Sequence, residues 1–194
     1  MMDDSAADPL PNALLVDDEK EVADAYALRL RGLCDVKTVY SGDSALQMVD
    51  EWDVDIILLD RHMPGISGDE VLDRLEERSF SGRVIMVTAI DPGFDVLDMP
   101  FDDYLCKPVD REDIREAVSQ QCRILGYETL GAYFSAESKR SVIEAELPEP
   151  ERGDHEGYQR ATERAETLKQ RTKRLLEEPE SLFDAFDDIE REGR

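Results

Sequence analysis

Cysteine and histidine are scarce in this sequence, with three and two residues among 194. Cys34, Cys106 and Cys122 are widely spaced and odd in number, so the sequence supports neither a disulfide framework nor a zinc site. Long apolar runs are also missing, because no stretch reaches the roughly 18–20 residues of a transmembrane helix. The start Met1-Met2-Asp3-Asp4 lacks the basic residues of a signal peptide. These absences predict free thiols, no membrane partner and a cytoplasmic location.

Basic residues are few as well, since 23 Lys and Arg face 47 Asp and Glu and leave a net charge of −24. Such a surface repels nucleic acid by default. An acidic composition can indicate disorder, but apolar segments at 13–16, 55–59 and 84–87 indicate a folded core. We interpret the acidity as adaptation to molar salt, where the screening length falls to about 3 Å. The composition resembles that of proteins from halophilic archaea.

After an acidic N-terminal arm at 1–10, strand-like and helical patterns alternate. The alternation predicts an α/β fold with a five-stranded, doubly wound parallel sheet in a domain at 11–124. The strand-like segments lie at about 12–16, 35–39, 55–59, 83–87 and 103–106, and the helical patterns at about 19–31, 43–51, 68–78 and 110–124. On the first helix we assign Val22, Ala25, Tyr26 and Leu30 to the buried face. Pro92, Gly93 and Pro100 predict that a helix between the last two strands is short or absent.

Strand signals stop after residue 124. A helical pattern at about 125–147, a breaker at 148–153 and a second helical pattern at about 156–178 predict an α-helical hairpin, with a hinge at Leu125-Gly126. An acidic tail at 181–194 follows, which we expect either to dock as an amphipathic helix or to stay mobile. In the second helix a heptad seam is predicted to pack against the first helix, and it consists of Tyr158, Ala161, Ala165, Leu168, Thr172 and Leu175.

Polar residues end four of the predicted strands. Asp17 and Asp18 follow the first strand, Asp60 the third, Thr88 the fourth and Lys107 the fifth. The carboxyl ends of parallel strands meet at one edge of the sheet, which is where open α/β sheets bind ligands. Three converging carboxylates repel one another unless a cation joins them, and hard oxygen ligands suit Mg²⁺. The sequence therefore predicts a magnesium site.

A carboxylate beside Mg²⁺ can act as a nucleophile toward a phosphoryl group, because the metal neutralises phosphate charge and fixes an in-line approach. Asp60 is the candidate nucleophile, and an acyl phosphate would result. Thr88 can donate a hydrogen bond to one phosphoryl oxygen, and Lys107 can pair its ammonium with another.

These motifs resemble the signature of the CheY-like receiver domain of two-component response regulators, a flavodoxin-like fold. The residues that carry the likeness are Asp17-Asp18, Asp60 with Met63-Pro64-Gly65, Thr88-Ala89 and Lys107-Pro108, and the match covers about residues 11–124. The resemblance implies a sensor histidine kinase as phosphodonor and a signalling protein rather than an enzyme.

The resemblance also implies a role for each matching position. Asp60 is then the phosphoacceptor and, with Asp18 and the backbone carbonyl of His62, a direct Mg²⁺ ligand, while Asp17 acts mostly through water. Thr88 becomes the switch hydroxyl and Lys107 the phosphate-binding lysine. Tyr104, three positions before Lys107, matches the aromatic residue whose rotamer follows the switch hydroxyl.

The C-terminal region does not resemble a winged helix or a helix-turn-helix. It resembles the HalX region that follows receivers in halophilic archaea, over about residues 125–180. The residues that carry this likeness are Gly126-Tyr127, Leu130 and the helix from Tyr158 to Leu176.

We therefore expect a response regulator that passes its signal through the C-terminal helices by contact with an output partner that the sequence does not name. A homodimer formed on phosphorylation is one expected assembly. The disfavoured alternative is a DNA-binding transcriptional regulator, and it rests on a basic stripe of the second C-terminal helix: Arg160, Arg164, Lys169, Arg171, Lys173 and Arg174. A small-molecule phosphatase fits worst, because His62 stands where such an enzyme needs a second acid.

Overall fold

The computed structural model describes residues 9–192, without the side chains of Asp95 and 187–192. The chain divides into two compact units, one spanning Leu10–Cys122 and the other including everything from Arg123 onward. Most of the predicted acidic arm at 1–10 lies outside the described residues. No helix among the described residues is long and apolar enough to cross a membrane.

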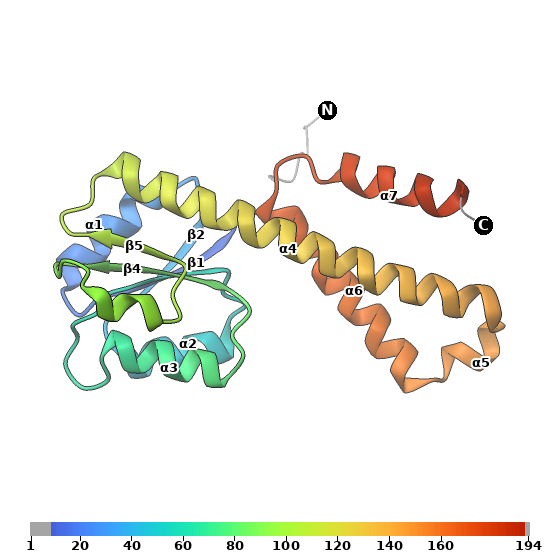
Figure 1. Cartoon of the computed structure of the whole chain (residues 1–194), viewed down its shortest axis with the longest axis horizontal. Coiled ribbons are helices and arrows are strands. Elements are labelled where there is room, and N and C mark those ends of the chain that lie inside the picture. The colour runs from blue at the N-terminus through green and yellow to red at the C-terminus, as the bar shows by residue number, and fades with distance from the viewer. Residues whose placement is uncertain (1–8, 193–194) are drawn as a thin grey trace, which may run out of the picture. The chain divides into compact units, whose positions relative to one another are not determined.

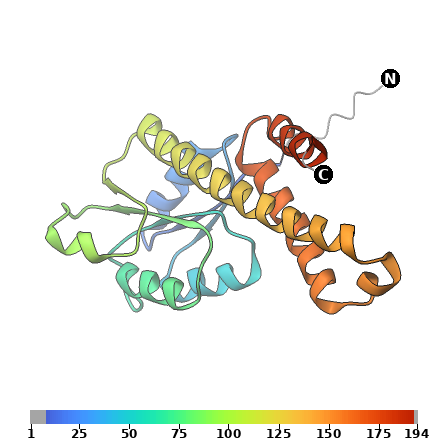
Figure 2. The same cartoon turned by 45° about the vertical axis from the view of Figure 1, so that its right-hand side comes forward.

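The first unit is built on a five-stranded parallel sheet in the order β2-β1-β3-β4-β5, as predicted. Figures 1 and 2 show α2 and α3 side by side on one face of this sheet, and α1 with the first turns of α4 on the other. The strands are β1 (Asn12–Val16), β2 (Asp35–Val39), β3 (Ile56–Leu59), β4 (Arg83–Thr88) and β5 (Asp103–Cys106), and the helices are α1 (Lys20–Leu30), α2 (Gly42–Glu51) and α3 (Gly68–Glu77).

The central strands form the core because they are apolar on both faces. Every residue of β3 is buried, as are the last four residues of β1 and the last five of β4. Continuous burial is expected of parallel strands that are covered by helices on both sides. Helices α2 and α3 begin at serine caps, where the hydroxyls of Ser41 and Ser67 accept hydrogen bonds from the backbone N–H groups of Ser44 and Glu70.

Two local predictions, the short helix between β4 and β5 and the buried face of α1, differ in how well they agree with the structure. The segment between β4 and β5 holds only a short 3₁₀ helix, η1 (Phe94–Asp98), which confirms the predicted loss of a full helix. The buried face of α1 was assigned correctly at Tyr26 and Leu30, but wrongly at Ala25, which is exposed while Ala23 is buried. Several alanines in this helix make its two faces similar in hydrophobicity, so the periodicity does not select one face.

The helices predicted at 110–124 and 125–147 are one continuous helix, α4 (Arg111–Glu146), so the predicted break at Leu125-Gly126 is wrong. Glycine lowers helix propensity but does not end a helix whose neighbours are good helix formers. Gly126 instead allows a close approach, because a Cβ there would lie 2.5 Å from Leu176 Cδ2.

The elements described in the second unit are all helices: the end of α4, α5 (Glu149–Gly153), α6 (Glu156–Leu175) and α7 (Glu180–Glu192). The predicted seam is confirmed, since all six of its residues are buried or half-buried. The predicted tail segment at 181–194 begins with α7, whose Phe183 is 4% exposed and meets the ring of Tyr133 at 5.2 Å. The ring of Phe186 stacks on Phe134 at 4.1 Å.

Two glycines of α4 provide a matched test of the close approach at Gly126. Gly131→Ala meets no atom within 4 Å and should stabilise the helical unit by about 1 kcal/mol through helix propensity. Gly126→Ala gains the same propensity but crowds Leu176, which we expect to cost about 1–3 kcal/mol relative to Gly131→Ala. Thermal unfolding followed by circular dichroism measures the difference. Equal effects of the two substitutions would contradict the packing role of Gly126.

Candidate functional site

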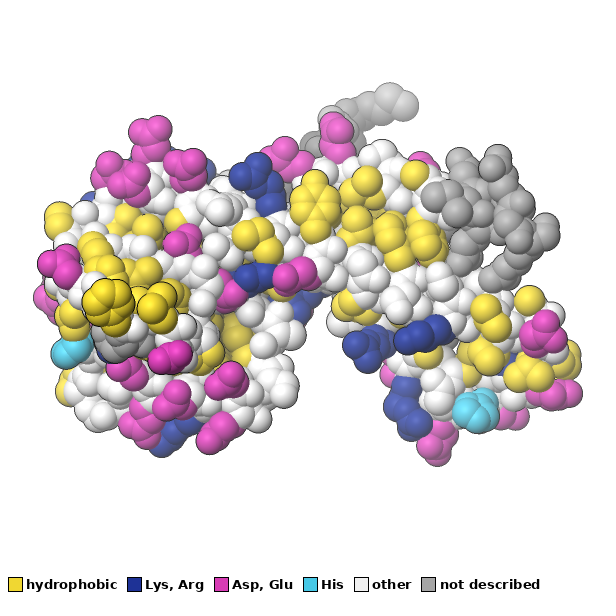
Figure 3. All heavy atoms as spheres, in the orientation of Figure 1, with side chains coloured by type: hydrophobic (Ala, Val, Ile, Leu, Met, Phe, Trp, Pro, Cys, Tyr) yellow, Lys and Arg dark blue, Asp and Glu magenta, His cyan; other side chains and the backbone are white. Residues whose placement is uncertain are grey.

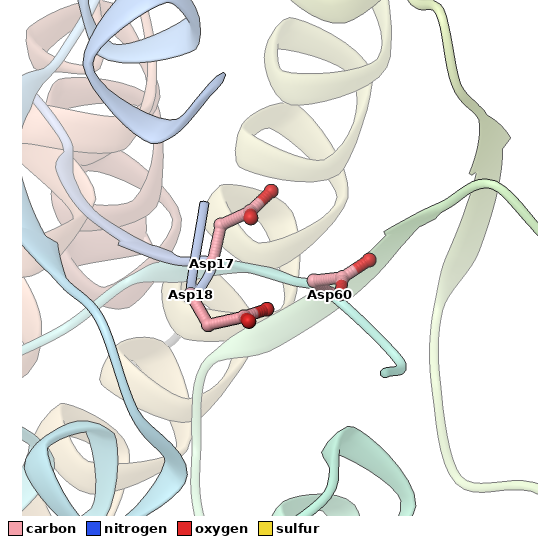
Figure 4. Close-up of side chains that lie close together, drawn as sticks. All are labelled: Asp17, Asp18 and Asp60. Carbon is pink, nitrogen blue, oxygen red and sulfur yellow. The ribbon is translucent and has the colours of Figure 1, made fainter. Parts of the chain in front are cut away.

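Three carboxylates converge at the carboxyl ends of β1 and β3. Asp17, Asp18 and Asp60 each offer an oxygen that lies within 4.8 Å of the others, and Figure 4 shows these side chains reaching toward a common space. Asp17 is 2% and Asp60 7% exposed, whereas Asp18 is open to solvent. The convergence predicted from the sequence is therefore present in the structure.

Backbone pairing positions the two residues with buried carboxylates, Asp17 and Asp60. β1 and β3 are neighbours with Val16 opposite Leu59, and the N–H of Asp60 donates to the carbonyl of Val16 at 2.9 Å. Each carboxylate then accepts a local backbone hydrogen bond. Asp17 Oδ1 accepts from the N–H of Glu19 at 3.0 Å, and Asp60 Oδ2 accepts from the N–H of His62 at 3.2 Å.

Lys107 joins the two buried acids. Its Nζ lies 2.6 Å from Asp17 Oδ2 and 3.2 Å from Asp60 Oδ1, and its side chain is 12% exposed. The backbone N–H of Lys107 donates to the carbonyl of Thr88 at 2.7 Å, so β4 positions the residue after β5. The peptide bond that follows, Lys107-Pro108, is cis.

Burial and charge act in opposite directions on the pKa of Asp60. Burial raises the pKa of this carboxyl, and the neighbouring Asp17 charge raises it further, while the ammonium and hydrogen bond of Lys107 lower it. The net pKa is raised, because burial is the largest effect. Burial lowers the pKa of Lys107, but its hydrogen bond to Asp17 and the two carboxylate charges outweigh this and raise it. Lys107 is therefore a firmly protonated cation.

Thr88 and Tyr104 are connected through one residue. Thr88 is 1% exposed at the end of β4, and its hydroxyl oxygen accepts a weak hydrogen bond from the N–H of Ile90 at 3.4 Å. The hydroxyl of Tyr104 donates to the carbonyl of Ile90 at 2.8 Å, and its ring packs on Phe101 at 5.5 Å. The two residues that sequence reasoning paired as a switch thus contact the same loop residue.

The loop after β3 contains an interaction that the sequence did not reveal. Arg61 holds Asp69 with three N–O contacts of 3.0–3.3 Å, and Arg61 is only 14% exposed. The carbonyl of Arg61 also accepts from the N–H of Gly68 at 3.0 Å. These bonds connect Arg61, the residue that follows Asp60, to the start of α3. The loop that contains His62 is therefore held at both of its ends. The side chain of His62 is exposed.

The donor set fits a hard divalent cation. Mg²⁺ binds carboxylate oxygens and water, and the three acids supply such oxygens with one exposed side where water can complete the coordination. Lys107 supplies one positive charge against three negative ones, so the cluster retains a negative charge that a divalent ion can neutralise.

Comparison with known proteins agrees with this geometry. Residues 13–119 match the family described as response regulator receiver domain, and the chain belongs to that family. Residues 123–192 match the HalX domain. Both resemblances inferred from the sequence are thereby confirmed.

Two relatives show how far the likeness extends. A putative transcriptional regulator of Haloferax volcanii is 37% identical over 191 residues, covering 89% of this chain but 33% of the relative. The transcriptional regulatory protein CutR of Streptomyces coelicolor is 38% identical over 99 residues, covering 49% of this chain and 46% of its own. The chain thus spans less than half the length of either relative.

Solved structures agree on the fold. The receiver domain of a putative LuxO repressor protein from Vibrio parahaemolyticus superposes with a TM-score of 0.60 and 26% identity, over 62% of this chain and 96% of that one. A CheY-like receiver domain protein of Methanospirillum hungatei gives a TM-score of 0.57 at 23% identity, over 61% and 98% of the two chains. At 23% identity, the similarity to the Methanospirillum hungatei protein supports the fold alone.

The Arg61–Asp69 pair should contribute measurably to stability. Asp69→Asn removes a charge-assisted bidentate contact with a largely buried guanidinium, so we expect a loss of about 1 kcal/mol. Glu70→Gln is the matched control, because Glu70 lies in the same first helical turn and pairs with Arg74 on the open surface. That change should cost less than about 0.5 kcal/mol. Urea unfolding compares the two variants, and equal losses would argue against the loop-closing role.

The raised pKa of Asp60 predicts a pH-dependent stability difference. A carboxyl whose folded pKa lies above its unfolded value destabilises the fold once it ionises, so the cost grows as pH rises above about 3.9 and is complete above the folded pKa. With divalent ions chelated, Asp60→Asn should unfold at a higher temperature than the unchanged chain at neutral pH. The gap should shrink as the pH is lowered toward the ordinary carboxyl pKa. A less stable Asp60→Asn at neutral pH would refute this.

Proposed function

We propose that this chain acts in the cytoplasm as the response regulator of a two-component phosphorelay. In this proposal Asp60 accepts a phosphoryl group from a sensor histidine kinase with Mg²⁺, and the C-terminal helices pass the signal on by protein contact. The observation that carries the proposal is the contact of Lys107 with both Asp17 and Asp60 within the three-carboxylate cluster. Membership in the receiver family supports it.

The proposed reaction is the transfer of a phosphoryl group to a carboxylate. A carboxylate oxygen of Asp60 attacks the phosphorus of the kinase phosphohistidine in line, and the P–N bond breaks as the new P–O bond forms, with the electron pair leaving on the imidazole. Mg²⁺ bound by the carboxylates would neutralise the charge of the phosphoryl oxygens. Asp18, Asp60 and the His62 carbonyl are the proposed direct ligands, and Asp17 acts through water.

After transfer, the added negative charge has to find new partners. Lys107 is already within hydrogen-bond distance of Asp60, so a short movement of its ammonium from Asp17 would bring it to a phosphoryl oxygen. Thr88 would donate its hydroxyl hydrogen to a second oxygen. Because Ile90 contacts both Thr88 and Tyr104, a shift of Thr88 would disturb the hydrogen bond of Tyr104. Tyr104 is therefore the proposed reporter of the phosphorylated state.

The DNA-binding alternative has support from the names of the relatives, two of which are transcriptional regulators. The basic stripe of α6 argues against it, because most of its cations have partners within the chain. Arg171 is 8% exposed, which corrects its assignment to a surface stripe, since burial against the helical unit removes it from solvent. Lys173 pairs with Glu180 at 2.7 Å, and Lys169 lies over the Tyr133 and Phe183 rings. Output through protein contact remains the favoured proposal.

Phosphorylation at Asp60 can be tested with acetyl phosphate as a small phosphodonor. In roughly molar KCl with Mg²⁺, the unchanged chain should gain the mass of one phosphoryl group, and hydroxylamine should remove it as expected of an acyl phosphate. Asp60→Asn should remain unlabelled, while the control Asp73→Asn, on the exposed side of α3, should be labelled normally. Chelation of Mg²⁺ should prevent labelling. Persistent labelling of Asp60→Asn would overturn the assignment.

Homodimerisation on phosphorylation stays a prediction, for which light scattering is the measurement.

A further inference from the structure

A cavity of about 270 Å³ lies at the tip of the helical hairpin, far along the chain from the carboxylate cluster. Its walls come from the last turns of α4, from α5 and from the first turns of α6. The volume is slightly below the range of about 300–1,000 Å³ typical of ligand pockets, which fits a molecule with a single ring or a short branched chain.

The hollow is bordered on α6 by a small residue, Ala161. Farther along the seam Ala165 is 3% exposed, so α4 and α6 are tightly packed there. Toward the tip, Gly157 and Ala161 line the cavity together with two large aliphatic residues, Ile143 of α4 and Leu147 just after that helix. Ile143 and Leu147 each remain 39% exposed, and on the α6 side the small side chain of Ala161 lines the same cavity. Solvent-exposed aliphatic side chains in a concave site favour an apolar ligand.

Hydrogen bonds hold the polar wall of the cavity in place. Glu144 Oε1 accepts from the Tyr158 hydroxyl at 2.5 Å and lies 3.4 Å from Arg140, which also pairs with Glu137 at 2.7 Å. Arg152 donates to the carbonyls of Glu144 and Leu147, both at 3.1 Å, and so satisfies the end of α4. Arg140 Nε is buried without a hydrogen-bond partner among the described residues. The wall is therefore formed before any ligand arrives.

Cations outnumber acids among the lining residues, but Glu137 and Glu144 compensate the charge of Arg140, so the positive charge offered to a ligand comes from Lys139 and Arg152. Lys139, Arg140 and Arg152 line the cavity, with Glu151 as the acid among the lining residues, in a chain of net charge −24. Arg152 donates to neutral carbonyls and lies 6.0 Å from the centroid of the Tyr158 ring, and Lys139 is exposed. The cationic rim therefore favours an anion. Figure 3 shows hydrophobic side chains gathered near α5, with acidic side chains among them and basic side chains along the neighbouring α6.

From the apolar floor and the cationic rim together, we infer that the hairpin tip binds a small organic carboxylate with a compact apolar body, such as an aromatic or branched aliphatic acid. The apolar part contacts Ile143 and Leu147, and the carboxylate lies toward Lys139 and Arg152. This site is separate from Asp60 and does not depend on the proposed phosphoryl transfer. A concave site of this volume suits a small molecule better than the flat surface of a protein partner.

Benzoate and 3-methylbutanoate are suitable probes, with benzyl alcohol as the neutral counterpart of benzoate. Titrated into the full chain in roughly molar KCl, the acids should shift the methyl NMR signals of Ile143 and Leu147 in a saturable manner and leave the core residue Ile85 unchanged. Benzyl alcohol should bind more weakly than benzoate. Equal affinity of the alcohol, or no saturable shift with either acid, would overturn the inference.

Two substitutions test the cationic rim and the apolar hollow separately, and a third serves as a control. Lys139→Gln should weaken benzoate binding roughly two- to fivefold, the effect of one exposed charge pair. Arg164→Gln, which removes the same charge from an exposed position of α6 outside the cavity, should leave it unchanged. Ala161→Phe should fill the hollow and abolish binding. Circular dichroism and thermal unfolding show whether that variant is folded, and unchanged binding by a folded Ala161→Phe would place the ligand elsewhere and refute the site.

Discussion

The repulsion among three carboxylates at one edge of the sheet is the constraint on which the receiver unit depends. Asp17 and Asp60 are almost fully buried, and a buried carboxylate is costly unless a positive charge and hydrogen bonds compensate it. Lys107 provides that charge from the end of β5, two strands away from Asp60. The strand order therefore contributes to the stability of the cluster, because it brings the ammonium of Lys107 to the acids.

Much of this arrangement could be predicted from the sequence because it is local. A buried parallel strand is a short apolar run, and the residue that follows it lies at the sheet edge, so Asp17, Asp60, Thr88 and Lys107 could be assigned without knowledge of tertiary contacts. The structure brings Lys107 into contact with Asp17 and Asp60 and connects Thr88 to Tyr104 through Ile90.

The features that were missed depend on contacts between segments. Nothing in the sequence pairs Arg61 with Asp69 eight positions later, because the bend between them is set by the way α3 packs on the sheet. Gly126 was interpreted as a break, although the structure uses its missing side chain for contact with Leu176. The cavity at Ala161 belongs to a seam that the heptad pattern identified, but the pattern does not show where small residues leave the seam open.

The few cations of this acidic chain mostly serve the fold. In the helical unit Arg140 joins Glu137 and Glu144, Lys169 lies 5.2 Å from the Phe183 ring centroid, and Arg171 is buried. Close or buried contacts of this kind are screened less by salt than interactions between distant surface charges. In molar salt a chain with few basic residues gains most by placing them in such contacts, which leaves fewer to contact a phosphate backbone.

Under the proposed function, the net charge of the site also connects binding of the metal to phosphorylation. Three carboxylates and one ammonium leave two negative charges, which a divalent cation would cancel. Forming an acyl phosphate replaces the single charge of Asp60 with roughly two, so the cluster would again become negative. Without the cation the same step would gather about three uncompensated negative charges at a site where Asp17 and Asp60 are almost fully buried. Metal binding and phosphorylation should therefore favour each other at this site. Lys107 is positioned to compensate part of the negative charge in either state.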